Sequence, residues 1–280
     1  MDKYGQLMNW LIATDLDGTL LNDEYPVEAA AAAVDGLFGL PALADGSVTL
    51  QVALATSKTL AECVRFADRC ANRPIIAFEN GAGLAWPTAA CKGRYEFACA
   101  GMDYSRIRER LQRLRAIPDY RFRGFGDMSA AEVAQRTGLD EESVADAMLR
   151  KASEPLVWEG SHRALRSFAK DLNVLGLDLE LGGRFHHVTG RSSKADAVAV
   201  IGQRLAGQRG AMATLACGDA PNDVDMMRAA DCALVFPGRN GGYVLPEGPK
   251  VTHARGAGPD IWSEHVSLLI QSNSLEVDCE

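Results

Sequence analysis

The sequence predicts an α/β protein in which a parallel-sheet core is interrupted by an inserted α+β segment. Three observations lead to this fold class. Short apolar runs alternate with helix-like stretches in the first and last thirds of the chain, which is typical of a parallel sheet. The middle of the chain has a different mixture of strand-like and helix-like stretches. Carboxylate and hydroxyl residues follow several of the apolar runs, where the ends of parallel strands commonly form a site.

The first third of the chain predicts alternating strands and helices. The strands are expected at 11–14, 48–55 and 74–78, and the helices at 29–37 and 60–71. Thr59 and Glu62 form a capping-box pattern, in which each side chain bonds the backbone amide of the other residue and so starts the second helix. The apolar residues that follow have helical spacing.

The middle of the chain predicts the insert, residues 89–189. Strands are expected at 95–100 and 120–125 and in a hairpin of 177–181 with 184–188, and helices at 105–115, 140–152 and 162–173. Ser129 and Glu132 form a second capping box, and Gly138 is the expected stop of the helix that they begin. Gly182 and Gly183 supply the turn of the hairpin.

The last third of the chain returns to the pattern of the first. Helices are expected at 195–205 and 261–270, and strands at 213–217 and 232–236. The predicted division of the chain is therefore a discontinuous core, 1–88 and 190–280, with the insert between its two parts. The hinges are expected at 87–93 and 189–193.

Composition and charge restrict the classes of partner. The net charge of −8 disfavours nucleic acid and anionic membranes as partners. It does not disfavour a small anionic substrate, because a bound metal ion can invert the local field. No apolar run approaches the roughly 18 residues of a membrane span, and the first ten residues lack the features of a signal peptide. The seven cysteines form no Cys-x-x-Cys pair, so we interpret them as reduced thiols and expect a cytoplasmic protein.

Asp15 and Asp17 follow the first apolar run and precede Gly18. Strand alternation points both carboxylates to the same side, where they repel each other unless a cation or a proton lies between them. The pattern predicts a metal site, a pair of acid–base groups, or both. A simple polar turn is the alternative, because Asp and Gly favour turns. A calcium loop is excluded, since its twelfth position, which needs Glu, is Pro26.

Four polar clusters lie at places that can meet at one edge of the sheet. They are Asp15 with Asp17, the run Thr56-Ser57-Lys58, Lys194, and Asp219 with Asn222 and Asp223. Each cluster alone has a simpler explanation as a helix cap, a solvated lysine or a polar turn. Their joint occurrence favours one shared site.

Together the clusters supply the parts of a phosphoryl-transfer site. Asp15 is the predicted nucleophile, because a carboxylate can form an aspartyl-phosphate. The predicted metal ligands are Asp15, Asp17 and Asp219, and Mg²⁺ is the expected ion because it prefers oxygen ligands. Thr56 and Lys194 are expected to donate hydrogen bonds to the phosphoryl oxygens.

Asp17 has a second predicted role as the general acid and base. It would protonate the leaving alcohol and then deprotonate the water that cleaves the intermediate. Asn222 and Asp223 are expected behind the metal site, where they would orient the waters of the ion and Lys194.

These residues resemble the four motifs of the haloacid dehalogenase (HAD) superfamily of phosphatases. The matching motifs are Asp15-x-Asp17-Gly-Thr19, the Thr56 position, Lys194, and Gly218-Asp219-x-x-Asn222-Asp223. The insert between the second and third motifs is similar to the type IIB cap. The resemblance implies a Rossmann-like core with an α/β lid that closes over the substrate.

Beyond these motifs the chain resembles the mannosyl-3-phosphoglycerate phosphatase family. The similar stretches are 55–59, 79–82, 126–129, 137–139, 153–155, 158–159, 182–187 and 255–259 with Trp262. Ala55-Thr56-Ser57-Lys58-Thr59 departs from the Ala-Thr-Gly-Arg run that is common in type IIB sugar phosphatases. The resemblance implies magnesium-dependent hydrolysis of mannosyl-3-phosphoglycerate to mannosylglycerate, a compatible solute.

The residues expected to bind the substrate are Ser57, Lys58, Asn80, Arg184 and His187. Arg184 is expected to form a fork to the glycerate carboxylate, although a surface charge on a hairpin is the alternative. His187 is expected to bond a sugar hydroxyl. His186 and His187 alternate faces on a strand, so at most one of them points inward.

The expected activity is that of a phosphoric monoester hydrolase, whose partner is a small phosphorylated sugar. Mannosyl-3-phosphoglycerate and its glucosyl analogue differ at one hydroxyl, and the sequence does not distinguish them. One alternative is a phosphatase or phosphotransferase acting on another sugar phosphate. A non-catalytic metal-binding protein is the other, and the complete set of motifs disfavours it. The sequence leaves the oligomeric state open.

Overall fold

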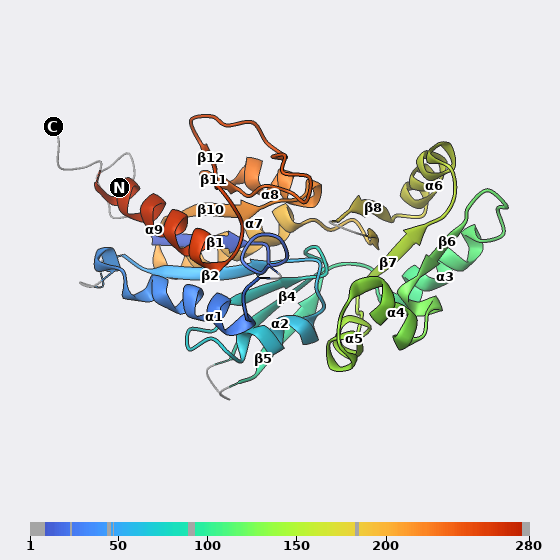
Figure 1. Cartoon of the computed structure of the whole chain (residues 1–280), viewed down its shortest axis with the longest axis horizontal. Coiled ribbons are helices and arrows are strands. Elements are labelled where there is room, and N and C mark those ends of the chain that lie inside the picture. The colour runs from blue at the N-terminus through green and yellow to red at the C-terminus, as the bar shows by residue number, and fades with distance from the viewer. Residues whose placement is uncertain are drawn as a thin grey trace.

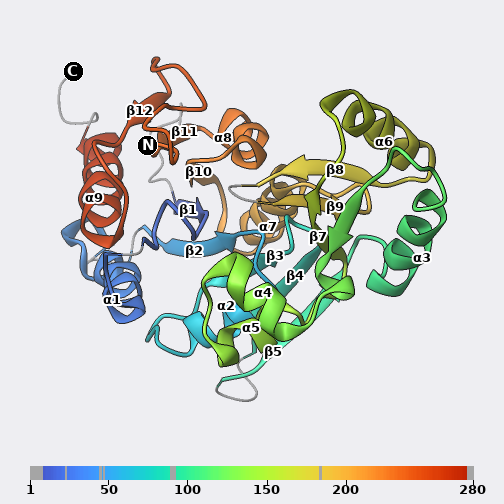
Figure 2. The ribbon, with the colours of Figure 1, turned by 45° about the vertical axis from the view of Figure 1, so that its right-hand side comes forward.

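The computed structural model describes residues 9–22, 24–43, 46, 48–88, 93–182 and 185–275, and these form two β-sheets with helices around them (Figures 1 and 2). The larger sheet has the strand order β12-β11-β10-β1-β2-β3-β4-β5. Its strands are β1 (Asn9–Thr14), β2 (Leu50–Ala55), β3 (Ile75–Phe78), β4 (Gly83–Pro87), β5 (Tyr95–Cys99), β10 (Met212–Gly218), β11 (Cys232–Val235) and β12 (Val251–His253). This sheet confirms the predicted α/β fold class.

The larger sheet is parallel from β12 to β3, and β4 and β5 add an antiparallel edge. Strand β1 lies between β10 and β2, so the carboxyl ends of three neighbouring parallel strands meet at one edge. Asp15, Thr56 and Asp219 directly follow these three strands. The sheet therefore brings together residues that lie far apart in the sequence.

Side chains of β1 alternate between two apolar layers, which explains why the strand is a continuous apolar run. Trp10 and Ile12 pack with α1, α2 and α9, whereas Leu11 and Ala13 pack with α7 and α8. The helices of these layers are α1 (Val27–Gly36), α2 (Leu60–Ala67), α7 (Lys194–Arg209), α8 (Val224–Ala229) and α9 (Pro259–Leu275). The predicted capping box of Thr59 and Glu62 is present at the start of α2.

The smaller sheet is antiparallel, in the order β6-β7-β9-β8. Its strands are β6 (Phe122–Gly124), β7 (Ser153–Trp158), β8 (Asp178–Leu181) and β9 (His186–Thr189), and the helices around it are α3 (Tyr104–Leu114), α4 (Ala130–Thr137), α5 (Glu141–Ala147) and α6 (His162–Val174). Leu156 and Val188 share a core with α3 and α6, which lie on the side away from the larger sheet (Figures 1 and 2). The opposite face of the smaller sheet is therefore directed to the larger one.

The structure corrects the sequence analysis in this region. Residues 148–152 were expected to be helical, but α5 ends at Ala147 and strand β7, which was not predicted, follows. Pro155 lies inside β7, which pairs on both sides. Proline has no backbone N–H and is rare in such a strand, which is why the sequence pattern failed to indicate it. Strands β4 and β12 and helix α8, all short, were also missed.

The predicted boundaries of the core, 1–88 and 190–280, and of the insert, 89–189, stay a proposal. Within the insert, β5 pairs with β4 and so extends the larger sheet. In the described part of the chain, no helix is both long enough and apolar enough to cross a membrane.

Candidate active site

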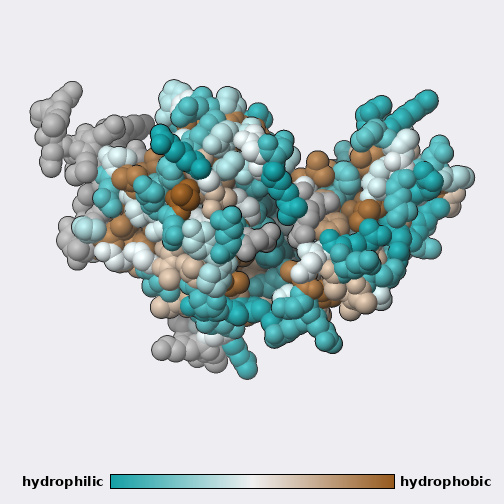
Figure 3. All heavy atoms as spheres, in the orientation of Figure 1, coloured by the Kyte–Doolittle hydropathy of each residue, from teal (hydrophilic) through white to brown (hydrophobic). Residues whose placement is uncertain are grey.

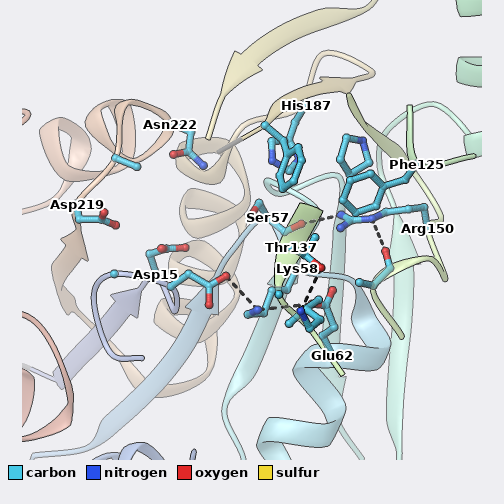
Figure 4. Close-up of a pocket in the computed structure, with 18 of the residues that line it drawn as sticks. Asp15, Ser57, Lys58, Glu62, Phe125, Thr137, Arg150, His187, Asp219 and Asn222 are labelled. Carbon is cyan, nitrogen blue, oxygen red and sulfur yellow. Dashed lines mark hydrogen bonds and ion pairs between the residues drawn. The ribbon is translucent and has the colours of Figure 1, made fainter. Parts of the chain in front are cut away.

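A cavity of about 490 Å³ lies between the carboxyl ends of the core strands and the inner face of the smaller sheet (Figure 4). The space-filling view also shows the surface hollowed between the two parts of the molecule (Figure 3). From the core, the cavity is lined by Asp15, Asp17, Gly18, Ser57, Lys58, Glu62, Asp219, Ala220, Asn222 and Arg239. From the insert, it is lined by Phe125, Thr137, Gly138, Leu139, Ala147, Arg150, Pro155, Phe185 and His187. Asp15 and Asp17 thus line the same cavity from the loop that follows β1.

Asp15, Lys194 and Asp223 form a buried charged group. The Lys194 ammonium donates to Asp15 Oδ1 at 2.7 Å and to Asp223 Oδ1 at 2.6 Å, and only 1% of its side chain is exposed. Burial alone would lower the pKa of Lys194, but the attraction of the two carboxylates outweighs it and raises the pKa. Lys194 is therefore a fixed cation behind Asp15.

Asp223 also fixes the loop that carries Asp219. Its Oδ2 accepts hydrogen bonds from the backbone amides of Asp219 at 3.1 Å and Ala220 at 3.0 Å. A Cβ at Gly218 would lie 2.4 Å from the Cβ of Asp223, so only glycine allows this close approach. Packing against Asp223 thus explains why glycine precedes Asp219, the predicted metal ligand.

The carboxylates of Asp15, Asp219 and Asp223 offer oxygen atoms within 4.8 Å of one another. Burial and the neighbouring carboxylates raise the pKa of Asp15 from 3.8 to about 8, against the opposing attraction of Lys194. Burial and Asp223 raise the pKa of Asp219 to about 6. The raised pKa values show that the ionised carboxylates repel one another around the single ammonium of Lys194, and the group offers hard oxygen donors. Both properties fit a divalent cation such as Mg²⁺.

The acidic cluster differs from the predicted metal ligands in one member. Asp17 was expected in it, but the described residues place Asp223 there instead. The side chain of Asp17 is 59% exposed, and its Oδ2 pairs with Lys58 Nζ at 3.0 Å. Lys58 also contacts Glu62 at 3.5 Å. The attraction of these two carboxylates raises the pKa of Lys58 against the effect of burial.

Of the Thr56-Ser57-Lys58 run, the last two residues line the cavity. Thr56 is buried beside it, and its hydroxyl accepts a hydrogen bond from the Lys58 amide at 3.3 Å. Asn80, expected to bind the substrate, is also fully buried and does not line the cavity. Its Oδ1 accepts from Asn222 Nδ2 at 3.0 Å, so it holds a residue that does line the cavity.

His187 lines the cavity from β9 and is buried, whereas His186 is half-buried and does not line it. The prediction that at most one of the two points inward is confirmed. Burial, together with Arg150 and Lys194, lowers the pKa of His187 to about 3, so its imidazole is neutral near pH 7. Its Nδ1 has no hydrogen-bond partner in the described part of the chain. Arg184, the other predicted residue on this hairpin, lies outside the described residues.

Arg150 is a cavity residue that the sequence analysis missed (Figure 4). It lies between α5 and β7, in the stretch that was expected to be helical. Its Nη1 donates to the carbonyl oxygen of Ser57 at 2.8 Å and so joins the insert to the core. No local pattern in the sequence indicates it, because Pro155 restricts only the residue before it and conceals the strand that follows α5.

Glu79 is a second missed residue, and it anchors the insert to the core. It directly follows β3 and is fully buried. Its carboxylate accepts hydrogen bonds from the amides of Lys151 and Ala152, both at 2.9 Å, and from the Ser153 hydroxyl at 2.7 Å. Both Glu79 and Asn80 have positive φ angles, 51° and 57°, which are uncommon for non-glycine residues and are often found beside functional sites.

Comparisons with known proteins agree with this geometry. No family model matches the chain. A curated glucosyl-3-phosphoglycerate/mannosyl-3-phosphoglycerate phosphatase from Methanococcoides burtonii is 32% identical, over 95% of this chain and 99% of that protein. The solved structure of a haloacid dehalogenase-like hydrolase from B. subtilis superimposes with a TM-score of 0.60 at 18% identity, over 93% of this chain and 98% of that chain. A HAD subclass IIB sugar phosphatase superimposes with a TM-score of 0.57 at 15% identity, over 95% and 99%.

Proposed function

The chain belongs to the glucosyl-3-phosphoglycerate/mannosyl-3-phosphoglycerate phosphatases, and from this premise we propose that it hydrolyses one or both of these esters through an aspartyl-phosphate on Asp15. It is a phosphoric monoester hydrolase with the fold of the HAD phosphatases. The observation that carries the mechanism is the buried Asp15 carboxylate, hydrogen-bonded to Lys194 at 2.7 Å and open to a cavity that it shares with Asp17.

Asp15 attacks the phosphorus atom. Lys194 occupies its Oδ1, and no described residue donates to Oδ2, so Oδ2 is the oxygen that forms the bond to phosphorus. The bond between phosphorus and the glycerate oxygen breaks, and the electron pair leaves with that oxygen. The ammonium of Lys194 offsets negative charge that would otherwise repel the phosphate.

Asp17 transfers the proton in both steps. Its exposed carboxylate lines the cavity, and the ion pair with Lys58 fixes its orientation. Asp17 gives its proton to the leaving glycerate oxygen, then takes one from the water that attacks the aspartyl-phosphate. The products are inorganic phosphate and the glycosylglycerate, and Asp15 returns to its carboxylate form.

Asp15 and Asp219 would hold a Mg²⁺ ion, with Asp223 and Asn222 behind them. When bound, the ion would supply charge neutralisation for the phosphoryl group and for the crowded carboxylates. Thr19 supports this assignment, because its hydroxyl donates to Asp219 Oδ1 at 3.3 Å and fixes that side chain. At Gly18, where φ is +84°, a Cβ would lie 2.6 Å from Asp219 Oδ2 and would block the site.

The role of the cap and the cellular location of the protein are also part of this proposal. Residues 89–189 form a cap that covers the substrate, since nine of the described residues that line the cavity come from it. Ser57, Lys58 and His187 bind the substrate from the two sides of the cavity, with Thr56 and Asn80 holding this region in shape. The described cysteines, Cys63, Cys70, Cys99, Cys217 and Cys232, are free thiols, which supports a reducing compartment such as the cytoplasm.

A phosphate-release screen tests the proposed function. The purified protein is assayed with Mg²⁺ against mannosyl-3-phosphoglycerate, glucosyl-3-phosphoglycerate and simple sugar phosphates, with and without an acceptor sugar. We expect the two glycosyl-3-phosphoglycerates to give the highest kcat/KM and to release phosphate without an acceptor. Higher kcat/KM on a simple sugar phosphate, or a requirement for an acceptor, would contradict the proposal.

A further inference from the structure

We propose that Arg150 binds the carboxylate of the substrate's glycerate group and so selects carboxylated phosphate esters, an inference that rests on the function proposed above. The sequence analysis assigned this role to Arg184, which lies outside the described residues. The structure offers a different guanidinium, which comes from the junction of α5 and β7 and lines the cavity directly.

The guanidinium of Arg150 has no acidic partner among the residues that the structure describes. Its Nε donates to the carbonyl oxygen of Ala147 at 2.9 Å, and its Nη1 donates to the carbonyl oxygen of Ser57 at 2.8 Å and to the Ser153 hydroxyl at 3.4 Å. These acceptors are all neutral, and Nη2 donates to none of the described residues. A half-buried cation without a counterion at a cavity surface is suited to an anionic ligand.

The core fixes the position of this guanidinium. The buried carboxylate of Glu79 accepts three hydrogen bonds from the residues that directly follow Arg150. The donors are the amides of Lys151 and Ala152 and the hydroxyl of Ser153. The guanidinium also contacts the Phe125 ring at 5.9 Å from its centroid. Arg150 is therefore held in place before a ligand arrives, which reduces the entropy lost on binding.

The other described cations of this region are less suited to a carboxylate. Lys58 already contacts Asp17 and Glu62, and Lys194 lies behind Asp15 and Asp223. Arg239 is exposed and lines the cavity from the core side, the side of the nucleophile, and not from the cap. Arg150 is the described cation that faces the cavity from the cap without a counterion.

The arrangement of the two sides matches the chemistry of a phosphoglycerate ester. Asp15, Asp219 and Asn222 lie on one side in Figure 4, and Arg150 and His187 on the other. If the phosphate group of the substrate lies at Asp15, the glycerate carboxylate of the same molecule can extend across the cavity toward Arg150. The planar fork of an arginine matches a carboxylate, while the neutral His187 suits a sugar hydroxyl.

The test compares two substrates that differ only in the carboxylate. One is mannosyl-3-phosphoglycerate, or the glucosyl ester if the wild type prefers it, and the other is the same compound with a hydroxymethyl group in place of the carboxylate. Wild type, Arg150→Gln, Arg150→Lys and the control Arg163→Gln are measured with Mg²⁺. Arg163 is exposed on α6 and does not line the cavity. Its substitution by Gln therefore removes one positive charge from the cap, as Arg150→Gln does, but at a place away from the cavity.

We expect Arg150→Gln to lower kcat/KM on the carboxylated substrate by roughly 10- to 100-fold, mainly through KM, because a charge-assisted bidentate pair is lost. On the hydroxymethyl analogue, the same variant should change kcat/KM by less than about threefold. Arg150→Lys should lie between, because it keeps the charge but not the fork. Arg163→Gln should match the wild type on both substrates.

An equal loss on both substrates would overturn the inference, since Arg150 would then act only by holding the Ser57 loop. Unchanged discrimination in Arg150→Gln would overturn it as well. If thermal unfolding shows that Arg150→Gln does not fold, Arg150→Lys is used in its place. The inference is then contradicted if Arg150→Lys prefers the carboxylated substrate over the hydroxymethyl analogue as strongly as the wild type does. A wild type that does not distinguish the two substrates would instead remove the proposed glycerate substrate, and this inference with it.

Discussion

The two sides of the cavity are built in different ways. On the core side, Asp15, Lys194, Asp219 and Asp223 are buried, and hydrogen bonds tie them to one another and to the backbone. On the cap side, Arg150 lacks an acidic partner and His187 has an unpartnered Nδ1 in the described part of the chain. The charged groups of the core side are thus fixed by one another and by the backbone, whereas on the cap side a guanidinium without an acidic partner and a ring nitrogen without a hydrogen bond face the cavity in the described part of the chain.

This difference assigns chemistry to one side and recognition to the other. Charged groups that are fixed in advance stabilise a phosphoryl group without reorganisation. Polar groups without partners bind only a ligand that satisfies them, so they reject molecules that lack the matching group. Variants of the core side should therefore lower turnover on every substrate, and variants of the cap side should alter the preference among substrates.

Asp15→Asn tests the core side most severely. An amide cannot form the acyl phosphate, so we expect turnover to fall below detection on all substrates while the protein stays folded. Phosphate release and thermal unfolding are the measurements. Arg163→Gln serves as the control for handling and folding. Appreciable residual turnover in Asp15→Asn would exclude the covalent mechanism.

Asp17→Asn should slow turnover of the glycerate ester by roughly 100-fold or more, the usual scale for a lost general acid–base group. The loss in the first step should be much smaller with p-nitrophenyl phosphate, whose leaving group needs no proton. Stopped-flow kinetics on both substrates measures this difference. An equal slowing of the first step on both would show that Asp17 does not protonate the leaving oxygen.

Glu79→Gln tests the anchor between the two sides. One of the three buried donors would lose its acceptor, so the free energy of unfolding should fall by about 1–3 kcal/mol. Urea denaturation measures the change. The matched control is Glu28→Gln, which removes an exposed carboxylate whose ion-pair partner among the described residues is Arg69, and it should have an effect within about 0.5 kcal/mol. Equal effects of the two variants would mean that the anchor does not stabilise the fold.

The smallest predicted effect is an increase of Tm by Mg²⁺ that depends on pH. Burial raises the pKa of Asp219 from 3.8 to about 6, so between these values the folded protein holds a proton that the unfolded chain has released. Without metal, this group lowers the free energy of unfolding as pH rises through that window. Mg²⁺ binds the deprotonated form, so its increase of Tm should be larger at about pH 7.5 than at about pH 5.

Differential scanning fluorimetry with and without Mg²⁺ measures this increase, with Asp219→Asn as the variant that should lose it. A Tm that Mg²⁺ leaves unchanged at both pH values would contradict the metal site. If Mg²⁺ raised Tm by the same amount at both pH values, the assignment of Asp219 as a ligand would be contradicted.

The sequence predicted the core side better than the cap side, for a physical reason. Asp15, Lys194 and Asp219 belong to short motifs at strand ends and helix starts, where the parallel sheet itself brings them together. Arg150 depends on an antiparallel pairing that Pro155 conceals, so no local pattern indicates where its side chain points. The ion pair between Asp17 and Lys58 is likewise a contact of the folded chain that the sequence pattern did not indicate.

Trapping the phosphorylated enzyme tests the central claim most directly. Asp17→Asn is mixed with p-nitrophenyl phosphate and Mg²⁺, quenched with acid at short times and analysed by mass spectrometry of its peptides. The mechanism predicts a burst of nitrophenolate that matches the amount of enzyme, with one phosphoryl group on the peptide that contains Asp15. Steady phosphate release without a burst and without label on Asp15, or label on another residue, would contradict it.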